Sequence, residues 1–325
     1  MEAIRLGLIG SGGMAKRRAA AFAAMEGWQL AAVAARNQQT GAPLAAVHQV
    51  PLLASWQELI GRADIDAVAI CTNNDSHGPI ARAALEAGKD VFLEYPLARR
   101  VDEGEELAQW ARDKGKVLRL AHPEAVDGEH ARLKEAVSSM GGLLLATFTR
   151  LTPGRGARPE VLFNIHASGP PSLFFVYHVY PLVDLFGAAA WVEGYAEYGG
   201  MNTAGIYQRF INRAVVGFAG GGTAQWTWAG GIAIERPEQH ERLVLEGGTL
   251  AYEDGAWHCS RAAGRDVLEP RQNEISLEGL FLEEVRGNRA DWRTDLDAGL
   301  AAVRIGSGAE VAAAEGRRVA LLQGG

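Results

Sequence analysis

Residues 9–15 read IGSGGMA, and this glycine-rich stretch decides the fold of the N-terminal region. It follows the apolar run Ile4–Ile9, which predicts a strand, and it precedes a helical pattern. Its form is G-x-G-x-x-A, in which Gly10 permits a tight turn, Gly12 lets the backbone approach a pyrophosphate and Ala15 allows close helix–strand packing. A helix N-terminus adds free N–H groups that bind phosphate. The stretch therefore predicts a dinucleotide-binding loop with contacts from Gly10, Ser11, Gly12, Gly13, Met14 and Ala15.

The residues after the second predicted strand indicate which dinucleotide binds. A site for NAD(H) usually carries a carboxylate about twenty residues after the glycine loop, where it binds the ribose 2′-hydroxyl. Here the strand Leu30–Ala34 leads into Arg36 and Asn37, with no carboxylate. Arg36, helped by Asn37, can bind a 2′-phosphate instead, so the sequence favours NADP(H). NAD(H) remains possible if Arg36 only stacks on the adenine.

The pattern along the chain predicts two domains. Over residues 1–121 short apolar runs alternate with helical stretches, and strands apolar on both faces imply a parallel sheet covered on both sides. We therefore expect a doubly wound Rossmann domain. From residue 122 to 325, extended segments joined by glycine turns predict an α+β domain with a large, mostly antiparallel open sheet. A final helix over Asp297–Glu315 can pack on either domain.

Composition excludes several classes of function. The formal net charge of −7 argues against nonspecific binding to nucleic acid or to an anionic membrane. Neither Cys71 nor Cys259 lies in a CxxC motif, and the eight histidines have no metal-ligand spacing, so we expect no metal and a reducing cytoplasmic location. No apolar run approaches the roughly 20 residues of a membrane span, and no signal-peptide pattern is present. We expect a small-molecule substrate and a homo-oligomer, dimer or tetramer, formed through the open sheet.

Two further loops complete a resemblance to a known family. Residues 71–77 read CTNNDSH, residues 94–97 read EYPL, and the chain ends in a helix running from Leu296 to Val319. With the glycine loop, these features resemble the glucose–fructose oxidoreductase, inositol dehydrogenase and rhizopine-catabolism family over essentially the whole chain. In that family the two loops commonly read T-P-x-x-x-H and E-K-P. The resemblance implies an NAD(P)-dependent oxidoreductase in which Thr72, Asn73, His77, Glu94 and Pro96 help to bind the cofactor.

The chain departs from the family's sugar and polyol dehydrogenases at two points. Those enzymes use the lysine of E-K-P together with an aspartate and a histidine from an H-x-x-D segment. Here Tyr95 replaces the lysine, His178 fits the histidine, and Pro181 stands at the aspartate position with Asp184 one turn further on. A tyrosine with a pKa of about 10 is a poorer base for alcohol oxidation than a lysine lowered toward neutrality.

One branch of the family, the biliverdin reductases, carries E-Y-P at this loop. Residues 55–60, 93–98 and 111–116 are also similar to the cyanobacterial members of that branch. The resemblance implies hydride transfer from NADPH to the central methine carbon of biliverdin, an open-chain tetrapyrrole, giving bilirubin. Such a conjugated substrate needs no strong base, because a ring nitrogen takes its proton from solvent or a nearby acid. Tyr95 is then either a proton donor or a platform on which the substrate stacks.

These considerations give a set of candidate residues and leave two other functions open. The expected catalytic residues are Glu94, Tyr95, His178 and Asp184. The expected substrate-binding residues are Tyr95, Tyr177, His178 and the arginines Arg150, Arg155 and Arg158, which offer cations to two propionates. Trp226 and Trp228 predict sheet packing or a subunit interface. The alternatives are a sugar, polyol or other carbonyl oxidoreductase in which His178 and Asp184 carry the proton, and a dinucleotide-binding regulator without turnover.

Overall fold

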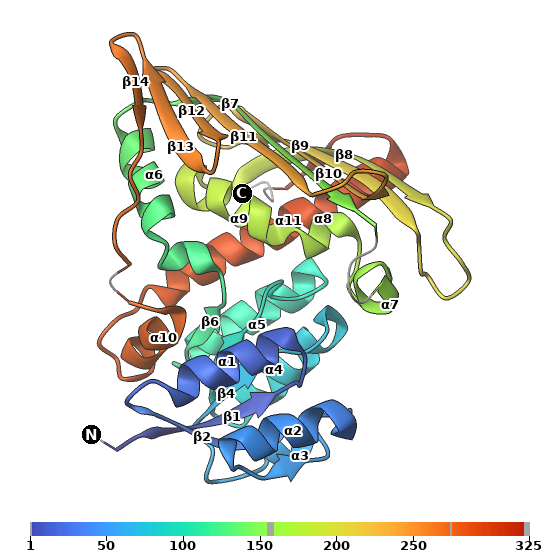
Figure 1. The fold of residues 1–325 in the computed structure, drawn as a ribbon, viewed down its shortest axis with the longest axis vertical. Coiled ribbons are helices and arrows are strands. Elements are labelled where there is room, and N and C mark those ends of the chain that lie inside the picture. The colour runs from blue at the N-terminus through green and yellow to red at the C-terminus, as the bar shows by residue number, and fades with distance from the viewer. Residues whose placement is uncertain (1, 155–158, 274, 322–325) are drawn as a thin grey trace. The chain divides into compact units, whose positions relative to one another are not determined.

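The computed structural model describes residues 2–154, 159–273 and 275–321. The chain divides into two compact units, one formed by residues 1–123 with 274–297 and the other by residues 124–273 with 298–325. Each unit is built around a sheet of its own, and the two sheets are visible in Figure 1 as separate groups of arrows.

The first unit contains a six-stranded parallel sheet in the order β3-β2-β1-β4-β5-β6. Its strands are β1 (Ile4–Ile9), β2 (Trp28–Ala34), β3 (Leu52–Leu53), β4 (Ala67–Ile70), β5 (Asp90–Leu93) and β6 (Leu118–Leu120). Its helices are α1 (Gly13–Ala23), α2 (Gln38–His48), α3 (Trp56–Ile60), α4 (His77–Glu86) and α5 (Val101–Asp113), with a 3-10 turn η1 (Asn74–Ser76). The predicted doubly wound Rossmann fold is confirmed. Its chain order reverses between β1 and β4, and ligands of such sheets bind at the carboxyl ends of the strands beside that point.

The second unit contains a nine-stranded sheet in the order β14-β13-β12-β11-β7-β10-β9-β8-β15. Its strands are β7 (Leu143–Pro153), β8 (Ala189–Gly199), β9 (Arg209–Phe218), β10 (Thr223–Ile232), β11 (Glu238–Leu245), β12 (Gly248–Glu253), β13 (Ala256–Arg261), β14 (Gly264–Val267) and β15 (Val319–Ala320). Its helices are α6 (Gly128–Ser138), α7 (Pro159–Leu162), α8 (Pro171–Phe174) and α9 (Val176–Phe186), after a 3-10 turn η2 (Pro123–Ala125). Among the described strands of this sheet only β7 and β10 pair in parallel, so the predicted mostly antiparallel sheet is confirmed.

One face of this sheet packs against helices, including α8 and α9 (Figure 1). Trp226 and Trp228 of β10 point to that face and are 0% exposed. On the opposite face the paired strands carry polar side chains such as Thr147 and Gln225, which lie side by side in the β7–β10 register. Exposed hydrophobic residues, among them Leu145 of β7, are scattered rather than continuous in the described strands. The oligomer expected through this face stays a prediction.

The segment 274–297, which the sequence assigned to the second domain, packs with the first unit instead. It holds α10 (Leu277–Val285) and the start of α11 (Trp292–Glu315). Phe281 of α10 stacks on Trp28 with ring centroids 5.2 Å apart, and it also contacts the rings of Phe22 and Phe92. The aromatic core of the Rossmann sheet thus needs a helix that arrives 250 residues later in the chain, a contact that spacing alone does not predict.

Arg119 of β6 fixes the same segment by charge. Its guanidinium is 0% exposed, and Nε donates a 2.8 Å hydrogen bond to Glu284 of α10. It also pairs with Asp295 at the start of α11. A buried cation between two carboxylates is stable only while all partners stay in place.

We expect Arg119→Ala to lower the free energy of unfolding by about 3–5 kcal/mol, because Glu284 would remain buried without a counter-charge. Urea denaturation of the purified variant measures this loss. Arg100→Ala is the matched control: it breaks an exposed ion pair with Asp102 and should cost less than about 1 kcal/mol. Equal losses in the two variants would contradict a structural role for the buried pair.

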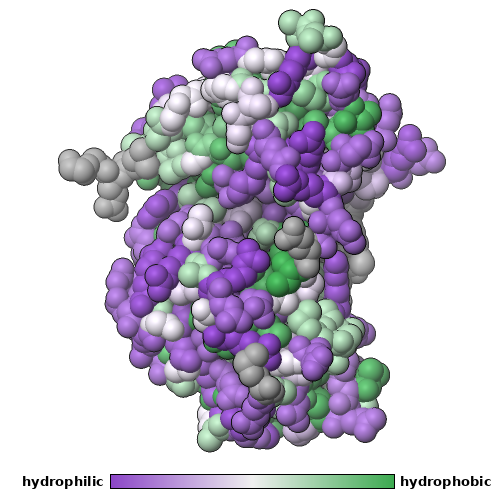
Figure 2. All heavy atoms as spheres, turned by 90° about the vertical axis from the view of Figure 1, so that its left-hand side faces the viewer, coloured by the Kyte–Doolittle hydropathy of each residue, from purple (hydrophilic) through white to green (hydrophobic). Residues whose placement is uncertain are grey.

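No helix in the described part of the chain is long and apolar enough to cross a membrane. Hydrophilic side chains predominate on the face drawn in Figure 2, where hydrophobic ones form separate groups. This surface agrees with the composition, in which 48% of residues are hydrophobic and 22% are charged.

Candidate functional site

The glycine loop has the geometry of a phosphate site. Gly10 adopts φ +124°, and a Cβ there would lie 2.2 Å from the carbonyl oxygen of Cys71, so only glycine fits. Gly12 is the N-cap of α1, and no side chain caps the helix. The first N–H groups of α1 are therefore left for a ligand, and Ala15 is fully buried where the helix meets the sheet. These residues fit the pyrophosphate of a dinucleotide.

The residues after β2 can bind the adenosine ribose. Ser11 and Thr40 share a 2.6 Å hydrogen bond between their hydroxyls, which joins the glycine loop to the start of α2. Asn37 caps α2, because its side chain accepts a 3.0 Å hydrogen bond from the N–H of Gln39. Arg36 directly precedes Asn37 in the chain and is exposed. Its guanidinium can bind a 2′-phosphate on the ribose.

Arg36→Ala should raise KM for NADPH by about 10–100-fold, because a charge-assisted hydrogen bond to the 2′-phosphate would be lost. KM for NADH should change less than about twofold, since that cofactor has no phosphate there. Steady-state kinetics with both cofactors measure the two effects in one protein. Equal changes would show that Arg36 acts on the shared adenine instead.

His77 joins the two loops that follow β4 and β5. It is 1% exposed, and its ring nitrogens lie 2.8 Å from the carbonyl oxygen of Pro96 and 3.3 Å from that of Thr72. Burial lowers the pKa of His77, although its hydrogen bonds to the two carbonyls oppose this effect. These contacts hold the two loops together, and Asn73 is half-buried in the first of them. The expected contacts of Thr72, Asn73, His77 and Pro96 with the cofactor stay predictions.

Glu94 occupies a buried ion pair. Nε of Arg18 donates a 2.7 Å hydrogen bond to Glu94, and Nη1 donates a 2.8 Å bond to Glu278 of α10. Burial raises the pKa of Glu94 despite the neighbouring cation. The carboxylate thus ties the fifth-strand loop to α1, and the catalytic role expected for it receives no support from these contacts. Arg18 was missed as a site residue, although Ala15 and Phe22, one turn before and after it, mark a core-facing stripe.

Tyr95 is half-buried at the end of this loop. Its ring stacks on His122, with centroids 5.4 Å apart and planes at 18°. The bond between Tyr95 and Pro96 is cis, as in the family that the loop resembles. The stacked pair gives the loop a flat aromatic element where the sugar dehydrogenases carry a flexible lysine.

The second unit contains a cavity of about 300 Å³ between the inner face of its sheet and helices α6 and α9. Its polar lining includes Glu124, Glu129, Tyr177, His178, Gln239 and Glu241. Tyr177 and His178, two of the predicted substrate residues, therefore reach one cavity. Arg150 lies beside it and donates a 2.9 Å hydrogen bond to Gln239, while Arg155 and Arg158 fall outside the described residues.

Two carboxyl groups in the cavity have strongly raised pKa values. Burial raises the pKa of Glu124 to about 7, with smaller contributions from the charges of Asp127, Glu241 and Asp184. Burial also raises the pKa of Glu241 to about 7, although Gln239 donates a hydrogen bond to it. Oε2 of Glu124 is shielded from solvent and has no hydrogen-bond partner among the described residues. Near neutral pH the cavity therefore holds carboxylic acids that can give up a proton, which the sequence analysis did not identify.

The raised pKa of Glu124 links stability to pH. Its folded pKa of about 7 exceeds the ordinary 4.5, so the neutral acid is favoured below pH 4.5 and stability is lost as pH rises through 7. Glu124→Gln should be more stable than the wild type by about 1–3 kcal/mol at pH 8 and equally stable near pH 4.5. Thermal unfolding across this range measures the difference, with the exposed Glu26→Gln as control. A difference that does not depend on pH would contradict the shift.

His178 is held by two tryptophans of β10. Nε1 of Trp228 donates a 3.0 Å hydrogen bond to His178 Nδ1, and Nε1 of Trp226 donates a 3.0 Å bond to its carbonyl oxygen. Burial lowers the pKa of His178 to about 3, and the nearby Arg150 adds to the effect. The imidazole is therefore far too weak a base to take a proton from an alcohol at neutral pH. The tryptophans bind this histidine, in addition to the sheet packing expected of them.

Asp184 lies outside the set of residues that line the cavity. It accepts a 2.7 Å hydrogen bond from His130 and a 2.8 Å bond from Lys134, both on α6. Burial raises its pKa, but these hydrogen bonds outweigh that effect and leave the pKa below its usual value. The carboxylate thus ties α9 to α6, and these contacts do not support the proton-carrying role expected for it.

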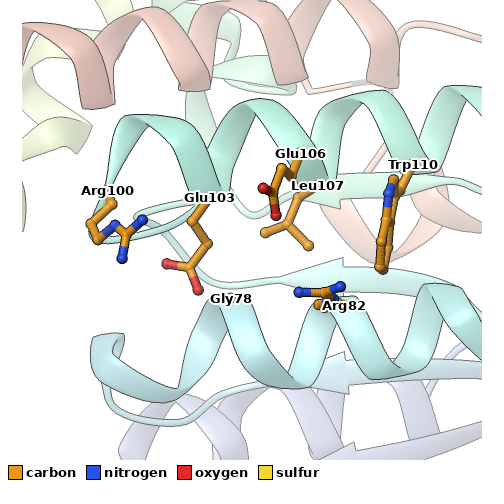
Figure 3. Close-up of a pocket in the computed structure, with 7 residues that line it drawn as sticks. All are labelled: Gly78, Arg82, Arg100, Glu103, Glu106, Leu107 and Trp110. Carbon is orange, nitrogen blue, oxygen red and sulfur yellow. The ribbon is translucent and has the colours of Figure 1, made fainter.

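A smaller groove of about 180 Å³ lies between α4 and α5 in the first unit (Figure 3). Arg82 lies over the ring of Trp110 at 4.4 Å, and Arg100 pairs with Asp102 at the start of α5. The groove mixes two arginines with Glu103 and Glu106, so it favours neither an anion nor a cation. In the described chain no group of three or more His, Cys, Asp or Glu side chains could hold a metal ion.

Comparison with known proteins relates the first unit to a known family. Residues 4–122 match the family described as oxidoreductases with an NAD-binding Rossmann fold, which includes the glucose–fructose oxidoreductases and inositol dehydrogenases. The match covers the first unit of the chain up to residue 122. The resemblance predicted from the glycine loop and the two strand-end loops is therefore confirmed, and a nicotinamide dinucleotide is the cofactor that the site fits.

Individual relatives point to more than one substrate. The crystal structure of biliverdin reductase from Synechocystis sp. PCC 6803, in complex with biliverdin and NADP+, is 26% identical, with a TM-score of 0.84 over 96% of this chain and 99% of that one. Human biliverdin reductase A is 31% identical over 44% of this chain and 45% of its own. An NADP(+)-dependent scyllo-inositol 2-dehydrogenase of Bacillus subtilis (strain 168) is 29% identical over 62% of this chain and 65% of its own. The chain spans about half the length of the first curated relatives it matches.

Proposed function

We propose that this protein is an NADPH-dependent reductase of a conjugated substrate, with biliverdin as the substrate and bilirubin as the product. The observation that supports this most is the absence of a base where the sugar dehydrogenases have one. Tyr95 stands in place of the lysine, and the pKa of His178 is lowered to about 3. The similarity to the Synechocystis biliverdin reductase over nearly the full chain agrees with the proposal.

The direction of the reaction follows from the groups that are present. Oxidising an alcohol requires a base that removes the hydroxyl proton, whereas reducing a conjugated methine requires an acid that supplies one. The cavity of the second unit provides acids, because Glu124 and Glu241 both have pKa values of about 7. A carboxyl group with a pKa of about 7 is partly protonated at neutral pH, so Glu124 and Glu241 can supply the proton that reduction needs.

The chemistry divides between the cofactor and the chain. NADPH, when bound, supplies the hydride, which adds to the central methine carbon of the tetrapyrrole. The carboxyl group of Glu124 or Glu241 gives a proton to a ring nitrogen, so one hydride and one proton are added in total. The carboxylate then takes a new proton from water. The protein otherwise orients the substrate. Arg150, which lies beside the cavity, can bind a propionate of the substrate through its guanidinium.

The cofactor proposed is NADPH because of the residues after β2. Arg36 is exposed after β2, and no carboxylate stands at the position that usually binds the ribose 2′-hydroxyl of NAD(H). Ser11 and Thr40 place two hydroxyls next to the glycine loop. NADH remains a usable cofactor at lower affinity, since the pyrophosphate and nicotinamide contacts do not depend on the 2′-phosphate.

Mixing the protein with biliverdin and NADPH should bleach the red absorption band of biliverdin and produce the yellow colour of bilirubin. Tyr95→Phe should retain turnover within about threefold if the ring is a platform, and Tyr95→Ala should lose about tenfold or more because the ring is gone. A loss of 10²-fold or more in Tyr95→Phe would instead assign the hydroxyl as a proton donor. Stopped-flow absorbance measures all three proteins.

The same preparation tests the alternatives. Reduction of NADP+ with a sugar or polyol, and no reaction of biliverdin, would contradict the proposal and favour a carbonyl oxidoreductase. Tight cofactor binding without turnover on either set of substrates would favour a dinucleotide-binding regulator.

A further inference from the structure

We infer that Trp228 is a positioning residue that makes His178 a permanent N–H donor, and that this donor binds an uncharged carbonyl oxygen of the ligand in the cavity. The geometry of the second unit supports the inference by itself. The identity of the ligand as biliverdin rests on the proposed function.

The hydrogen bond from Trp228 decides the tautomer of His178. An indole Nε1–H can only donate, so Nδ1 of His178, 3.0 Å away, must be the acceptor. A neutral imidazole carries one proton, and if Nδ1 accepts, that proton is on Nε2. Burial keeps the ring neutral, so the second proton that would make both nitrogens donors is absent.

The ring is also fixed in orientation. Phe175 stacks on it with centroids 5.4 Å apart and planes at 11°, and Phe148 of β7 contacts it at 4.3 Å. Trp226 holds the backbone carbonyl of the same residue with a 3.0 Å hydrogen bond. A donor that is held in place before the ligand arrives costs little ordering entropy on binding.

Nε2 is the nitrogen left for a ligand. His178 lines the cavity, and no hydrogen bond to Nε2 is found in the described part of the chain. An N–H group requires an acceptor, and an oxygen is the commonest acceptor in a small molecule. The donor therefore selects ligands that present an oxygen to this wall of the cavity.

The carboxyl groups around the donor restrict the charge of that oxygen. Glu124, Glu129 and Glu241 line the same cavity, and a carboxylate or phosphate of the ligand would lie close to their negative charge whenever they ionise. An uncharged carbonyl oxygen has no such repulsion. In biliverdin the matching group is a terminal lactam carbonyl, and the nearby Arg150 is left for a propionate.

The test compares two tryptophans of one strand. Trp228→Phe keeps a ring in the core and removes only the donor to Nδ1, whereas Trp226→Phe removes only the donor to the backbone carbonyl. In ¹⁵N-histidine-labelled protein, long-range ¹H–¹⁵N spectra should show His178 protonated on Nε2 alone in the wild type and in Trp226→Phe. Trp228→Phe should show a mixture of both tautomers, and its KM for biliverdin should rise by about threefold to tenfold.

A second pair of variants covers the case in which Trp228→Phe does not fold. His178→Gln keeps a side-chain N–H donor and should retain more of the biliverdin affinity than His178→Phe, which keeps a ring without a donor. Biliverdin binding is followed by its absorbance without cofactor, so affinity is read separately from turnover.

The outcomes separate this inference from the proposed function. A wild-type His178 protonated on Nδ1 would overturn it whatever the substrate is. Biliverdin affinity equal in His178→Gln and His178→Phe would also overturn it, even if biliverdin is reduced. If biliverdin neither binds nor reacts, the proposed function fails, and the two tautomer spectra still decide whether Trp228 positions His178.

Discussion

The buried guanidinium of Arg18 is the interaction on which the first unit depends. It lies on α1, directly after the glycine loop, and binds Glu94 of the fifth-strand loop and Glu278 of α10 at once. Three segments that are far apart in sequence therefore share one charge. A buried cation without its partners would destabilise the fold. The ion pair of Arg18 with Glu94 therefore constrains the position of α1 relative to the loop that carries Tyr95. The phosphate loop follows β1 and the aromatic loop follows β5; β4 lies between these strands, and Arg18 joins α1 to the aromatic loop across it.

In the second unit one physical cause acts in opposite directions on two kinds of group. Burial disfavours charge, so it lowers the pKa of His178 to about 3 and raises that of Glu124 to about 7. The histidine in this cavity thus becomes a weaker base, and the carboxyl group stays partly protonated near neutral pH. The rings of Phe148, Phe175 and Trp228, which lie against His178, exclude water from it.

The sequence predicted those features that depend on local pattern. The glycine loop requires Gly10 at positive φ, a feature that follows from neighbours within a few positions. Features made by distant residues were not predictable in the same way. The pairing of Arg18 with Glu278 spans 260 positions, and Trp228 and His178 meet across 50. The sequence motif identified His178 itself. Its partner Trp228 is brought to it by the pairing of β10 with its neighbours, and this partner decides the tautomer of the histidine.

The replacement of the lysine by Tyr95 and the low pKa of His178 support the same conclusion by independent routes. A lysine at residue 95 could serve as a base for an alcohol, whereas a tyrosine with a pKa of about 10 is poorly suited to that role. In the second unit, His178 accepts a hydrogen bond from Trp228 and its pKa is lowered to about 3, so it is a weak base as well. The Rossmann loop, with Gly10 at positive φ and the uncapped N-terminus of α1, keeps features that the pyrophosphate of a dinucleotide needs. A conjugated substrate, whose reduction needs a proton donor and a flat binding surface, fits this combination and the proposed function.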